Sequence, residues 1–324
     1  MTDFELPTLA SVEAAAALIS PVLTPTAQIC WPLLSARAGT EVWVKHENHN
    51  PTGAFKVRGG LTYMADLKAR APETTGVIAA TRGNHGQSIA HAARRYGMTA
   101  TIVVPRGNSK EKNAATMAYG ADLVEYGADF QEALEHAVAL GETRKLHAVP
   151  SFDMGLVRGV ATYALEMLRS ISDLDTVYVP IGLGSGIAGM IAMRDALGLA
   201  TKVVGVVAEG AAGYALSFAA GRPVPTNQAM TVADGLAVRT PHAQAVEIVC
   251  KGADRIVTVS DAEIRAAMTH YYTDTHNLAE GAGAAGLAAL LQEKRSMAGK
   301  KVGVVLTGGN VDLPVYTGIV GAQA

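Results

Sequence analysis

One lysine in this sequence stands where it could act as a nucleophile. Lys56 follows Phe55 in the segment 50–60, which reads Asn-Pro-Thr-Gly-Ala-Phe-Lys-Val-Arg-Gly-Gly, between a strand-like stretch at 41–45 and the expected start of a helix. An amine held against an aromatic ring in a half-buried position has a lowered pKa, because desolvation disfavours the charged form. A neutral lysine amine can form a Schiff base with an aldehyde or a ketone. The alternative is an ordinary surface lysine at a helix start.

A second candidate segment, Thr81-Arg82-Gly83-Asn84-His85, directly follows an expected strand at 76–80. A glycine turn that leads into a helix presents backbone N–H groups without partners, and together with the helix dipole they suit an anion such as a carboxylate. The Asn84 amide could in addition hydrogen-bond an oxygen atom of a ligand. The alternative is a plain strand–turn–helix connection in which Thr81 or Asn84 caps the helix.

A glycine-rich loop, Gly182-Leu183-Gly184-Ser185-Gly186, follows another expected strand. Glycines let the backbone approach an anion closely, so consecutive N–H groups and the next helix form a phosphate cradle. A rival interpretation is a dinucleotide site, because Gly184, Gly186 and Gly189 fit G-x-G-x-x-G and Glu209 stands about 20 positions further on. A third is a glycine turn that serves only helix–strand packing.

Two further polar residues stand at the ends of expected elements. Thr307 follows the last expected strand, where its hydroxyl points into the crevice in which α/β proteins bind ligands, and it could hydrogen-bond a ring nitrogen. Glu280 precedes an expected helix that runs to 291, and it either borders the site or is only a favourable partner of the helix dipole. Thr307 has a similar alternative, a simple turn at a strand end.

The elements that must position these residues alternate between strands and helices. Apolar runs rich in β-branched residues occupy positions 76–80, 99–104, 121–125, 176–179, 202–207, 255–259 and 301–306. They are nearly continuous rather than alternating, which is typical of strands buried on both faces of parallel sheets. Alanine-rich helical patterns lie between them and favour right-handed crossover units. We therefore expect an α/β fold with two αβ lobes and a cleft between them.

The composition argues against several classes of protein. The 324 residues are 49% hydrophobic and 17% charged, which indicates a compact protein and not a disordered one. The net charge of -2 without a basic block predicts no nucleic-acid partner. We expect no signal peptide and no membrane contact, because the N-terminus is acidic and every long apolar run is interrupted. Cys30 and Cys250 form no spacing motif, so a reduced, cytoplasmic protein is expected.

Taken together, these motifs resemble the pyridoxal-phosphate (PLP) enzymes of the tryptophan-synthase-β type, PLP fold type II. Within that group the chain most resembles the serine/threonine dehydratase and serine racemase family, from about Thr24 to Asp312. The family pattern Ser-Phe-Lys-x-Arg-Gly-Ala corresponds to the segment 54–60. The resemblance implies two open αβα domains with mostly parallel twisted sheets and the cofactor in the cleft. We expect a large PLP-binding domain of residues 1–68 plus 153–324 and a small mobile domain of residues 76–148.

The resemblance also implies a role for each motif. Lys56 is then the Schiff-base lysine, and Phe55 lies against the cofactor ring. Thr307 stands opposite the pyridine nitrogen. Asn84 holds the 3-oxygen of the cofactor. The remaining expected contacts are the phosphate cup Gly182, Leu183, Gly184, Ser185 and Gly186, and the substrate-binding residues Thr81, Arg82, Gly83, Asn84, His85 and Ser151, with Phe152 and Asp153 beside Ser151 in a side-chain pocket.

The residue opposite the pyridine nitrogen bears on the type of reaction. A hydroxyl such as that of Thr307 does not hold the ring nitrogen protonated as a carboxylate would. The cofactor is then a weaker electron sink, and a carbanion at Cα is shorter-lived. Loss of a β-hydroxyl group is therefore expected in preference to transamination.

The sequence departs from the family pattern at several positions. Arg82 replaces the serine that serves racemases as acid and base, and because an arginine is a poor base, racemization is not expected. Arg82 contacts an anionic substrate or points to solvent. Leu183 and Ser185 interrupt the usual tetraglycine and alter the shape of the cup. The acidic residues of metal-binding members are replaced by Val207 and by a non-acidic residue near Gly213. His46, Glu47, His49, His270 and His276 also lack metal-ligand spacing, so no metal is predicted.

The predicted function is a PLP-dependent α,β-elimination of a 3-hydroxy-L-amino acid. L-Threonine and L-serine are the default substrates, and the products are a 2-oxo acid and ammonia. The alternatives are a dehydratase for an arylserine or a 3-hydroxyaspartate, a serine racemase, and an NAD-dependent oxidoreductase. A homodimer is implied by the resemblance alone, and the only other expected partner is a small amino-acid substrate.

Overall fold

The computed structural model describes residues 5–322 and contains two sheets of mostly parallel strands. The larger sheet has the strand order β1-β2-β10-β7-β8-β9, and only its edge strand β1 is antiparallel to its neighbour. Its strands are β1 (Gln28–Cys30), β2 (Glu41–His46), β7 (Thr176–Pro180), β8 (Lys202–Ala208), β9 (Arg255–Val259) and β10 (Lys301–Leu306). The smaller sheet is wholly parallel, with the order β5-β4-β3-β6. Its strands are β3 (Gly76–Ala80), β4 (Thr99–Val104), β5 (Asp122–Glu125) and β6 (His147–Ala148).

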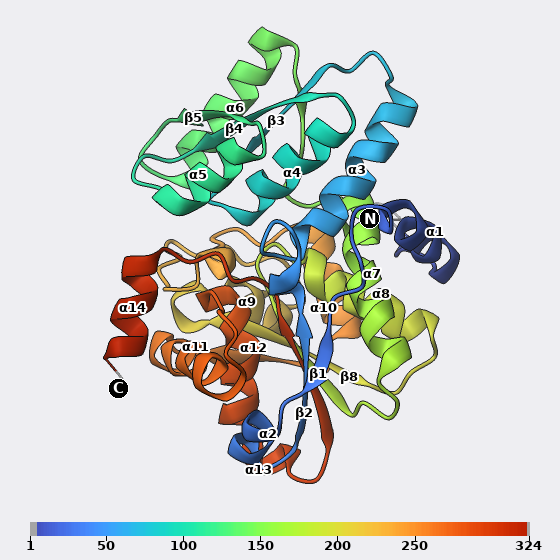
Figure 1. Cartoon of the computed structure of the whole chain (residues 1–324), viewed down its shortest axis with the longest axis vertical. Coiled ribbons are helices and arrows are strands. Elements are labelled where there is room, and N and C mark those ends of the chain that lie inside the picture. The colour runs from blue at the N-terminus through green and yellow to red at the C-terminus, as the bar shows by residue number, and fades with distance from the viewer. Residues whose placement is uncertain (1–4, 323–324) are drawn as a thin grey trace.

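The predicted α/β class is confirmed, and the strands follow the apolar runs of the sequence closely. We call the six-stranded sheet with its helices the large unit, and the four-stranded sheet with α4 (Asn84–Arg95), α5 (Lys110–Ala118) and α6 (Phe130–Arg144) the small unit. Figure 1 shows the small unit above the large one, with the helix α3 (Lys56–Arg70) running between them. Each unit is therefore a sheet covered by helices.

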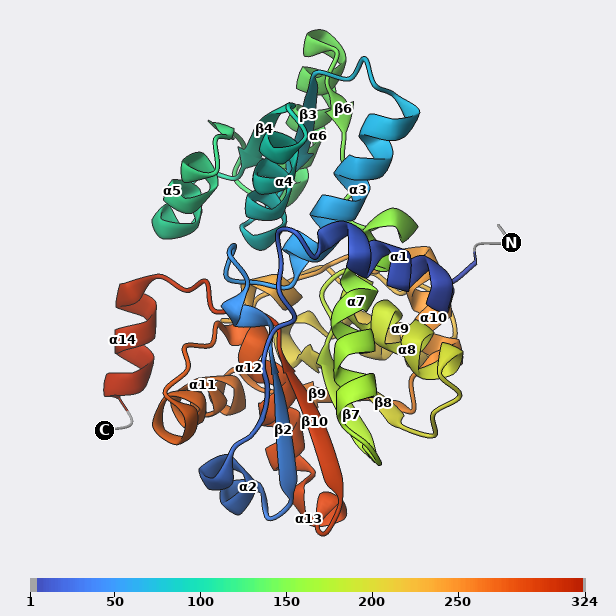
Figure 2. The ribbon, with the colours of Figure 1, turned by 45° about the vertical axis from the view of Figure 1, so that its right-hand side comes forward.

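Helices cover both faces of the large sheet (Figure 2). One face carries α1 (Leu9–Ile19), α7 (Met154–Ser170), α8 (Ser185–Ala196), α9 (Gly213–Ala220) and α10 (Ala243–Gly252). The other carries α2 (Pro32–Ala38), α11 (Asp261–Thr275), α12 (Gly281–Gln292), α13 (Lys294–Met297) and α14 (Leu313–Gly321). Short 3-10 turns complete the unit as η1 (Glu47–His49), η2 (Glu209–Ala211) and η3 (Asp234–Leu236).

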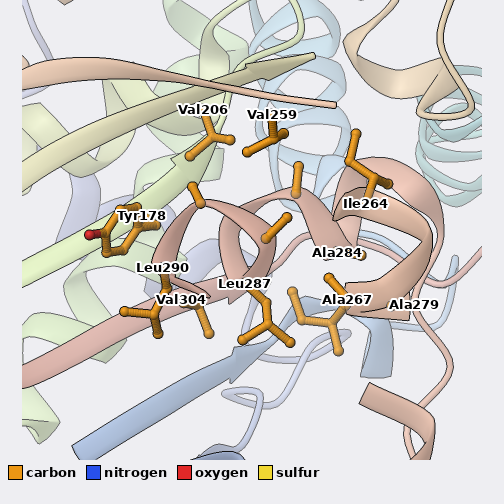
Figure 3. Packing of buried hydrophobic residues seen from close by; sticks show 14 of the residues in the cluster. Tyr178, Val206, Val259, Ile264, Ala267, Ala279, Ala284, Leu287, Leu290 and Val304 are labelled. Atoms are coloured by element: carbon orange, nitrogen blue, oxygen red, sulfur yellow. The ribbon is translucent and has the colours of Figure 1, made fainter. Parts of the chain in front are cut away.

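The two faces of the large sheet explain its continuous apolar runs. Along β10, Val304 and Leu306 pack into the core beneath α11 and α12, while Val305 packs into the core beneath α7 and α8. Successive side chains of a strand point to opposite faces, so a sheet covered on both sides needs apolar residues at every position. Figure 3 shows the first of these cores, in which Leu287 and Leu290 of α12 lie close to Val304.

Helix α3 joins the units through unusually close contacts. A Cβ atom added to Gly59 would lie 2.6 Å from the carbonyl oxygen of Leu156 in α7, and one added to Gly60 would lie 2.3 Å from Oγ of Ser88 in α4. Glycine is required at both positions, because any side chain would push the neighbouring helix away. The start of α3 is therefore pressed between the large unit and the small unit.

None of the helices formed by residues 5–322 is long and apolar enough to cross a membrane.

Candidate active site

The start of α3 is held by the end of the last strand of the large sheet. The N–H of Phe55 donates to the carbonyl oxygen of Thr307 at 3.0 Å, and Ala54 pairs with Gly308 as an isolated antiparallel bridge. Lys56 is the first residue of the helix. Two segments that lie far apart in the sequence therefore fix the place of the lysine.

The Lys56 amine has the properties that the sequence predicts for a nucleophile. Nζ lies 5.0 Å from the centre of the Phe55 ring and has no hydrogen-bond or ion-pair partner among residues 5–322. Burial lowers the pKa of Lys56 to about 8, and the negative charge of Glu280 opposes this shift. A substantial fraction of the amine is therefore neutral near physiological pH.

The glycine loop lies beside the same phenylalanine. It connects β7 to α8, and a Cβ atom added to Gly186 would lie 3.7 Å from the Phe55 ring. Gly184 has a φ angle of +102°, which an L side chain rarely adopts, and a Cβ atom on Gly182 would lie 2.3 Å from the carbonyl oxygen of Gly235. The N–H groups of the first turn of α8 have no partner within the helix. The loop can therefore hold a phosphate group at a helix N-terminus.

Tyr214 of α9 holds the shape of this loop from behind. Its hydroxyl donates to the carbonyl oxygen of Leu183 at 2.8 Å and accepts a hydrogen bond from the N–H of His242 at 3.2 Å. Ser185, which replaces a glycine of the family pattern, is buried at the first position of α8. The loop keeps backbone donors despite the two replaced glycines.

The Asn84 amide is fixed in one orientation by two neighbours. Nδ2 of Asn84 donates to Oε1 of Glu280 at 2.6 Å, and Oδ1 of Asn84 accepts from Nδ2 of Asn310 at 2.8 Å. Asn310 is itself oriented, because its Nδ2 also donates to the carbonyl oxygen of Thr52 at 2.8 Å. One hydrogen of Nδ2 of Asn84 remains for a ligand.

The other residues of the segment 81–85 differ in exposure. Thr81 is buried, and its hydroxyl accepts a hydrogen bond from the N–H of Gly83 at 3.0 Å. His85 is buried, its Nε2 has no partner among the described residues, and burial together with the charge of Lys56 lowers its pKa to about 3. The imidazole is therefore neutral. Arg82 is exposed and forms no ion pair within residues 5–322.

Thr307 and the segment before α7 complete the predicted set. Thr307 is 6% exposed, and its hydroxyl makes no hydrogen bond within the described part of the chain. Phe152 is buried against the ring of His242, with 4.6 Å between ring centres, and it lies next to Gly184. Asp153 uses its carboxylate to cap α7, accepting from the N–H of Gly155 at 2.7 Å. Ser151 is half-buried just before this cap.

Asn310 and Lys112 also lie in this region, and neither is recognisable as a site residue from the sequence. Asn310 falls in the turn after β10, where only Thr307 stands out. Lys112 lies in the polar stretch Lys-Glu-Lys at the start of α5, which reads as a solvated helix end, yet its side chain is 8% exposed and packs on Gly83. Glu280, which the sequence places only at a possible border of the site, directly contacts Asn84.

The glycine pattern of a dinucleotide site has another physical cause here. A Cβ atom added to Gly189 would lie 2.9 Å from the Cα atom of Ala161, so this glycine serves the close packing of α8 on α7. Glu209 is exposed in η2. Among residues 5–322, no group of three or more His, Cys, Asp and Glu side chains gathers closely enough to hold a metal ion.

These residues fit a phosphate-bearing aldehyde with an aromatic ring. A partnerless amine adjoins an aromatic side chain, a helix start can hold a phosphate, and an oriented amide and an unpaired hydroxyl offer hydrogen bonds to the ring. Phe55 contacts both the glycine loop and the backbone of Thr307, while Glu280 links Asn84 to Gly308. The predicted residues Lys56, Asn84, the glycine loop and Thr307 are thus connected by direct contacts.

Comparison with known proteins agrees with this arrangement. Residues 19–308 match the family model described as pyridoxal-phosphate-dependent enzyme. The chain is 35% identical to a protein of Thermotoga maritima named L-threonine ammonia-lyase, over 97% of this chain and 78% of that protein. It is 31% identical to a Saccharomyces cerevisiae protein named L-threo-3-hydroxyaspartate ammonia-lyase, over 98% of both chains.

A solved structure gives the same result for the fold. The processed form of threonine deaminase isoform 2 from Solanum lycopersicum superposes with a TM-score of 0.88 at 29% identity, covering 98% of this chain and 95% of that one. The predicted family and the type of fold are confirmed. The chain belongs to the family of pyridoxal-phosphate-dependent enzymes, and within that family it is an ammonia-lyase.

Proposed function

We propose that this enzyme removes water from a 3-hydroxy-L-amino acid, with L-threonine and L-serine as its preferred substrates. The enamine that is released then takes up a water molecule and gives a 2-oxo acid and ammonia. The observation that carries the proposal is the partnerless Lys56 amine, whose pKa is lowered to about 8, beside Phe55. It is supported by the likeness to L-threonine ammonia-lyase along most of the chain.

Pyridoxal phosphate supplies an electron sink for the bond cleavage at Cα when it is bound. We propose that the loop 182–186 holds its phosphate through backbone N–H groups, and that Phe55 packs on its ring. The free N–H of Asn84 would contact the ring 3-oxygen, and the hydroxyl of Thr307 would face the ring nitrogen. A neutral hydroxyl at that place favours elimination over transamination for the electronic reason given above.

Lys56 would move the proton at Cα of the substrate. A general base works best when its pKa lies near the working pH, because it is then neutral and still a strong enough acceptor. Desolvation brings the amine into that range, and Glu280 keeps the pKa from falling further. After the transfer the proton is held on Nζ, where the negative charge of Glu280 stabilises it.

The start of α4 would bind the carboxylate of the substrate. Its first N–H groups have no partner within the helix, and the helix dipole favours an anion there. The neutral imidazole of His85 has a free Nε2 and can add a hydrogen bond without adding charge. Binding and orientation, rather than further proton transfer, are the proposed task of residues 81–85.

Racemization is not proposed, because an arginine side chain at position 82 is a poor base. A second substrate class has support of its own, a 3-hydroxyaspartate. The guanidinium of Arg82 is exposed and unpaired among the described residues, next to the segment that would bind the carboxylate. The named relative from Saccharomyces cerevisiae matches 98% of the chain. Arg82 could pair with a second carboxylate on the substrate.

A substrate panel tests the proposal. Release of 2-oxo acid would be measured for L-threonine, L-serine, L-threo-3-hydroxyaspartate and a phenylserine, and D-serine formation would be followed in parallel. Preference for L-threonine or L-serine supports the main proposal, whereas preference for the diacid that falls in Arg82→Ala supports the second. Ammonia release from none of them would refute both.

The side-chain pocket has a test of its own. We propose that Ser151, with Phe152 and Asp153, shapes the pocket for the β-substituent. Because Phe152 and Asp153 also serve packing and capping, Ser151→Ala is the more informative variant. It should change the ratio of kcat/KM values for L-threonine and L-serine, and an unchanged ratio would reject the assignment.

We further propose that the protein is cytoplasmic and forms a homodimer. Each protomer would contain a large domain, residues 1–68 plus 153–324, and a small mobile domain, residues 76–148. The dimer is supported by the resemblance and by exposed apolar side chains near α14: Tyr272, Leu278, Leu313 and Val315. Both cysteines are free, as expected in a reducing compartment. Sedimentation of the wild type and of Leu313→Asp tests the dimer.

A further inference from the structure

A single buried cation connects the small unit with the large unit next to the site. Nζ of Lys112, on α5 of the small unit, lies 3.3 Å from Oδ2 of Asp234 and 3.6 Å from Oε2 of Glu280, both in the large unit. Among residues 5–322 no other side chain of the small unit forms an ion pair with a carboxylate of the large unit. Lys112 therefore forms the ion pairs that cross this boundary between described residues.

Lys112 stands at one end of a chain of polar contacts. Glu280 accepts a hydrogen bond from Asn84, and Asn84 accepts one from Asn310, which also donates to Thr52 in the segment before Lys56. Asn84 belongs to the small unit, whereas Glu280 and Asn310 belong to the large unit. The orientation of the Asn84 amide thus depends on side chains from both units.

Glu280 orients the Asn84 amide together with Asn310, and the protonation state of Glu280 decides which amide atom it can pair with. A carboxylate only accepts hydrogen bonds, so it selects Nδ2 of Asn84, but a protonated carboxyl also donates and could pair with Oδ1. Glu280 is 5% exposed, burial raises its pKa, and Lys112 is the largest influence that lowers it again. A buried carboxylate left without a cation is strongly destabilised.

We infer that Lys112 is a positioning residue that completes the cofactor site when the small unit sits against the large one. By pairing with Glu280 it keeps the carboxylate in place, and Glu280 then turns an N–H of Asn84 toward the cofactor. The Asn84 amide would therefore be oriented only when the small unit is in contact with the large unit. The inference rests on the proposed function, because it takes Asn84 to contact the cofactor.

The same helix offers a matched control. Glu111, the neighbour of Lys112, also reaches the large unit, because its Oε1 accepts a hydrogen bond from the N–H of Leu313 at 2.8 Å. That contact is exposed and does not involve Glu280. Glu111→Ala therefore removes a contact between the units and leaves the chain from Lys112 to Asn84 intact.

The test compares Lys112→Gln, Lys112→Arg and Glu111→Ala in the holoenzyme. Lys112→Gln should lower kcat by about 10- to 100-fold, which is the usual cost of a slightly misplaced catalytic group. It should also shift the visible absorbance of the bound cofactor and weaken its Kd, with a smaller change in KM. Lys112→Arg should recover most of both readouts, and Glu111→Ala should change neither.

A double-mutant cycle separates positioning from a general loss of stability. If Lys112 acts through Asn84, Lys112→Gln should have less than about a threefold effect on cofactor Kd when Asn84 is already Ala, because residues in one network are not additive. Equal effects in both backgrounds, or a lowered Tm with an unchanged absorbance band, would overturn the inference.

A second variant covers the case in which Lys112→Gln folds poorly. Glu280→Gln keeps an oxygen that can accept from Asn84 and removes the charge that needs a cation. The double variant Lys112→Gln/Glu280→Gln should therefore fold and bind cofactor better than Lys112→Gln, and a double variant that is worse would count against the inference. If the wild type releases no 2-oxo acid, the proposed function fails while these absorbance and Kd readouts still decide the inference.

Discussion

Two groups of buried charge adjoin the start of α3, and they are built in opposite ways. The sealed cluster comprises Lys45, Glu47, Arg58 and Glu166 and lies in the interior of the large unit and α3. The boundary cluster comprises Lys112, Asp234 and Glu280 and lies between the two units. The first is saturated with short contacts, whereas the second is sparse.

Every N–H of Arg58 in the sealed cluster is directed at an acceptor. Its guanidinium binds both carboxylate oxygens of Glu47 at 2.7 and 2.9 Å and both of Glu166 at 2.6 and 2.9 Å, and it also reaches Thr162 at 2.9 Å. Lys45 adds a third contact to Glu166, at 2.5 Å. Two cations balance two anions, so the cluster is buried without an unpaired charge.

The boundary cluster is looser. Its two contacts measure 3.3 and 3.6 Å, and the carboxylate of Asp234 is 50% exposed. The pair of Lys112 with the half-exposed Asp234 contributes little to stability, whereas the pair with Glu280 is buried but longer than the contacts of Arg58. The contacts of Arg58 lie within the large unit and α3 and hold the start of the helix, next to Lys56. The contacts of Lys112 cross from the small unit to the large unit, so they depend on the two units being in contact.

Substitution of Lys56 should have a larger effect on activity than any other change considered. Lys56→Ala should lower activity by roughly 10³-fold or more, because both the nucleophile and the proposed base are lost. Borohydride reduction of the wild type should attach the cofactor to this side chain, as peptide mass mapping would show. Active wild-type protein without modification at Lys56 would contradict the entire assignment, and a retained Tm in the variant is the control for folding.

The sealed cluster should show the largest effect on stability. Arg58→Met leaves Glu47 and Glu166 buried without their main partner, which should cost about 3–5 kcal/mol in the free energy of unfolding measured by urea titration. Arg169→Met removes an arginine from an exposed pair with Glu13 and should cost less than about 1 kcal/mol. If the two variants lost similar amounts of unfolding free energy, the buried contacts of Arg58 would be no more stabilising than the exposed pair of Arg169 with Glu13.

The boundary cluster should act on the titration of Lys56. In the cofactor-free protein the amine is protonated below pH about 8 and neutral above it, so its reactivity toward an acylating reagent should rise through that pH. Glu280→Gln removes the charge that opposes the shift, and the midpoint should move lower still. Glu111→Ala should leave the midpoint in place, and an upward move in Glu280→Gln would contradict the assigned sign.

The same titration predicts how stability depends on pH. The usual pKa of lysine is 10.5, so between pH about 8 and 10.5 the unfolded chain binds a proton at Lys56 that the folded cofactor-free protein has released. Its contribution to the free energy of unfolding should therefore rise with pH across that window. Comparing unfolding curves of the wild type and Lys56→Met isolates this contribution, which must disappear in the variant.

Among the contacts of Arg58 in the sealed cluster, the one with Thr162 should matter least. Thr162→Val removes one neutral acceptor of Arg58 and keeps the shape of the side chain, so it should cost about 1 kcal/mol of stability. The kcat value should stay the same, because four contacts to carboxylate oxygens still hold Arg58. A drop in kcat without a drop in stability would place Thr162 closer to the reaction than its position suggests.

The sequence predicts much of the fold because its signals are local. Continuous apolar runs identify strands covered on both faces, and glycine turns before helices identify the anion-binding loops. The short strand β1, of three residues, carries too little pattern to be recognised.

The charge clusters could not be predicted, because their partners lie far apart in the chain. Arg58 and Glu166 are separated by 108 positions, and Lys112 looks like a solvated residue until the large unit covers it. Periodicity reports which face of an element is buried, and it does not report which charge meets which. The roles of the individual site residues stay predictions until the variants above are measured.

The saturated contacts of Arg58 give α3 a fixed pivot. The helix has 15 residues, and beyond its first turn Leu61, Met64 and Leu67 pack into the core of the small unit. Lys56 lies about 3 Å from Arg58 along the axis, and Arg70 lies about 18 Å away, at 1.5 Å per residue. If the small unit swings and carries the far end of α3 with it, the end should travel about six times as far as the lysine. In such a swing the Lys56 amine would move much less than the small unit.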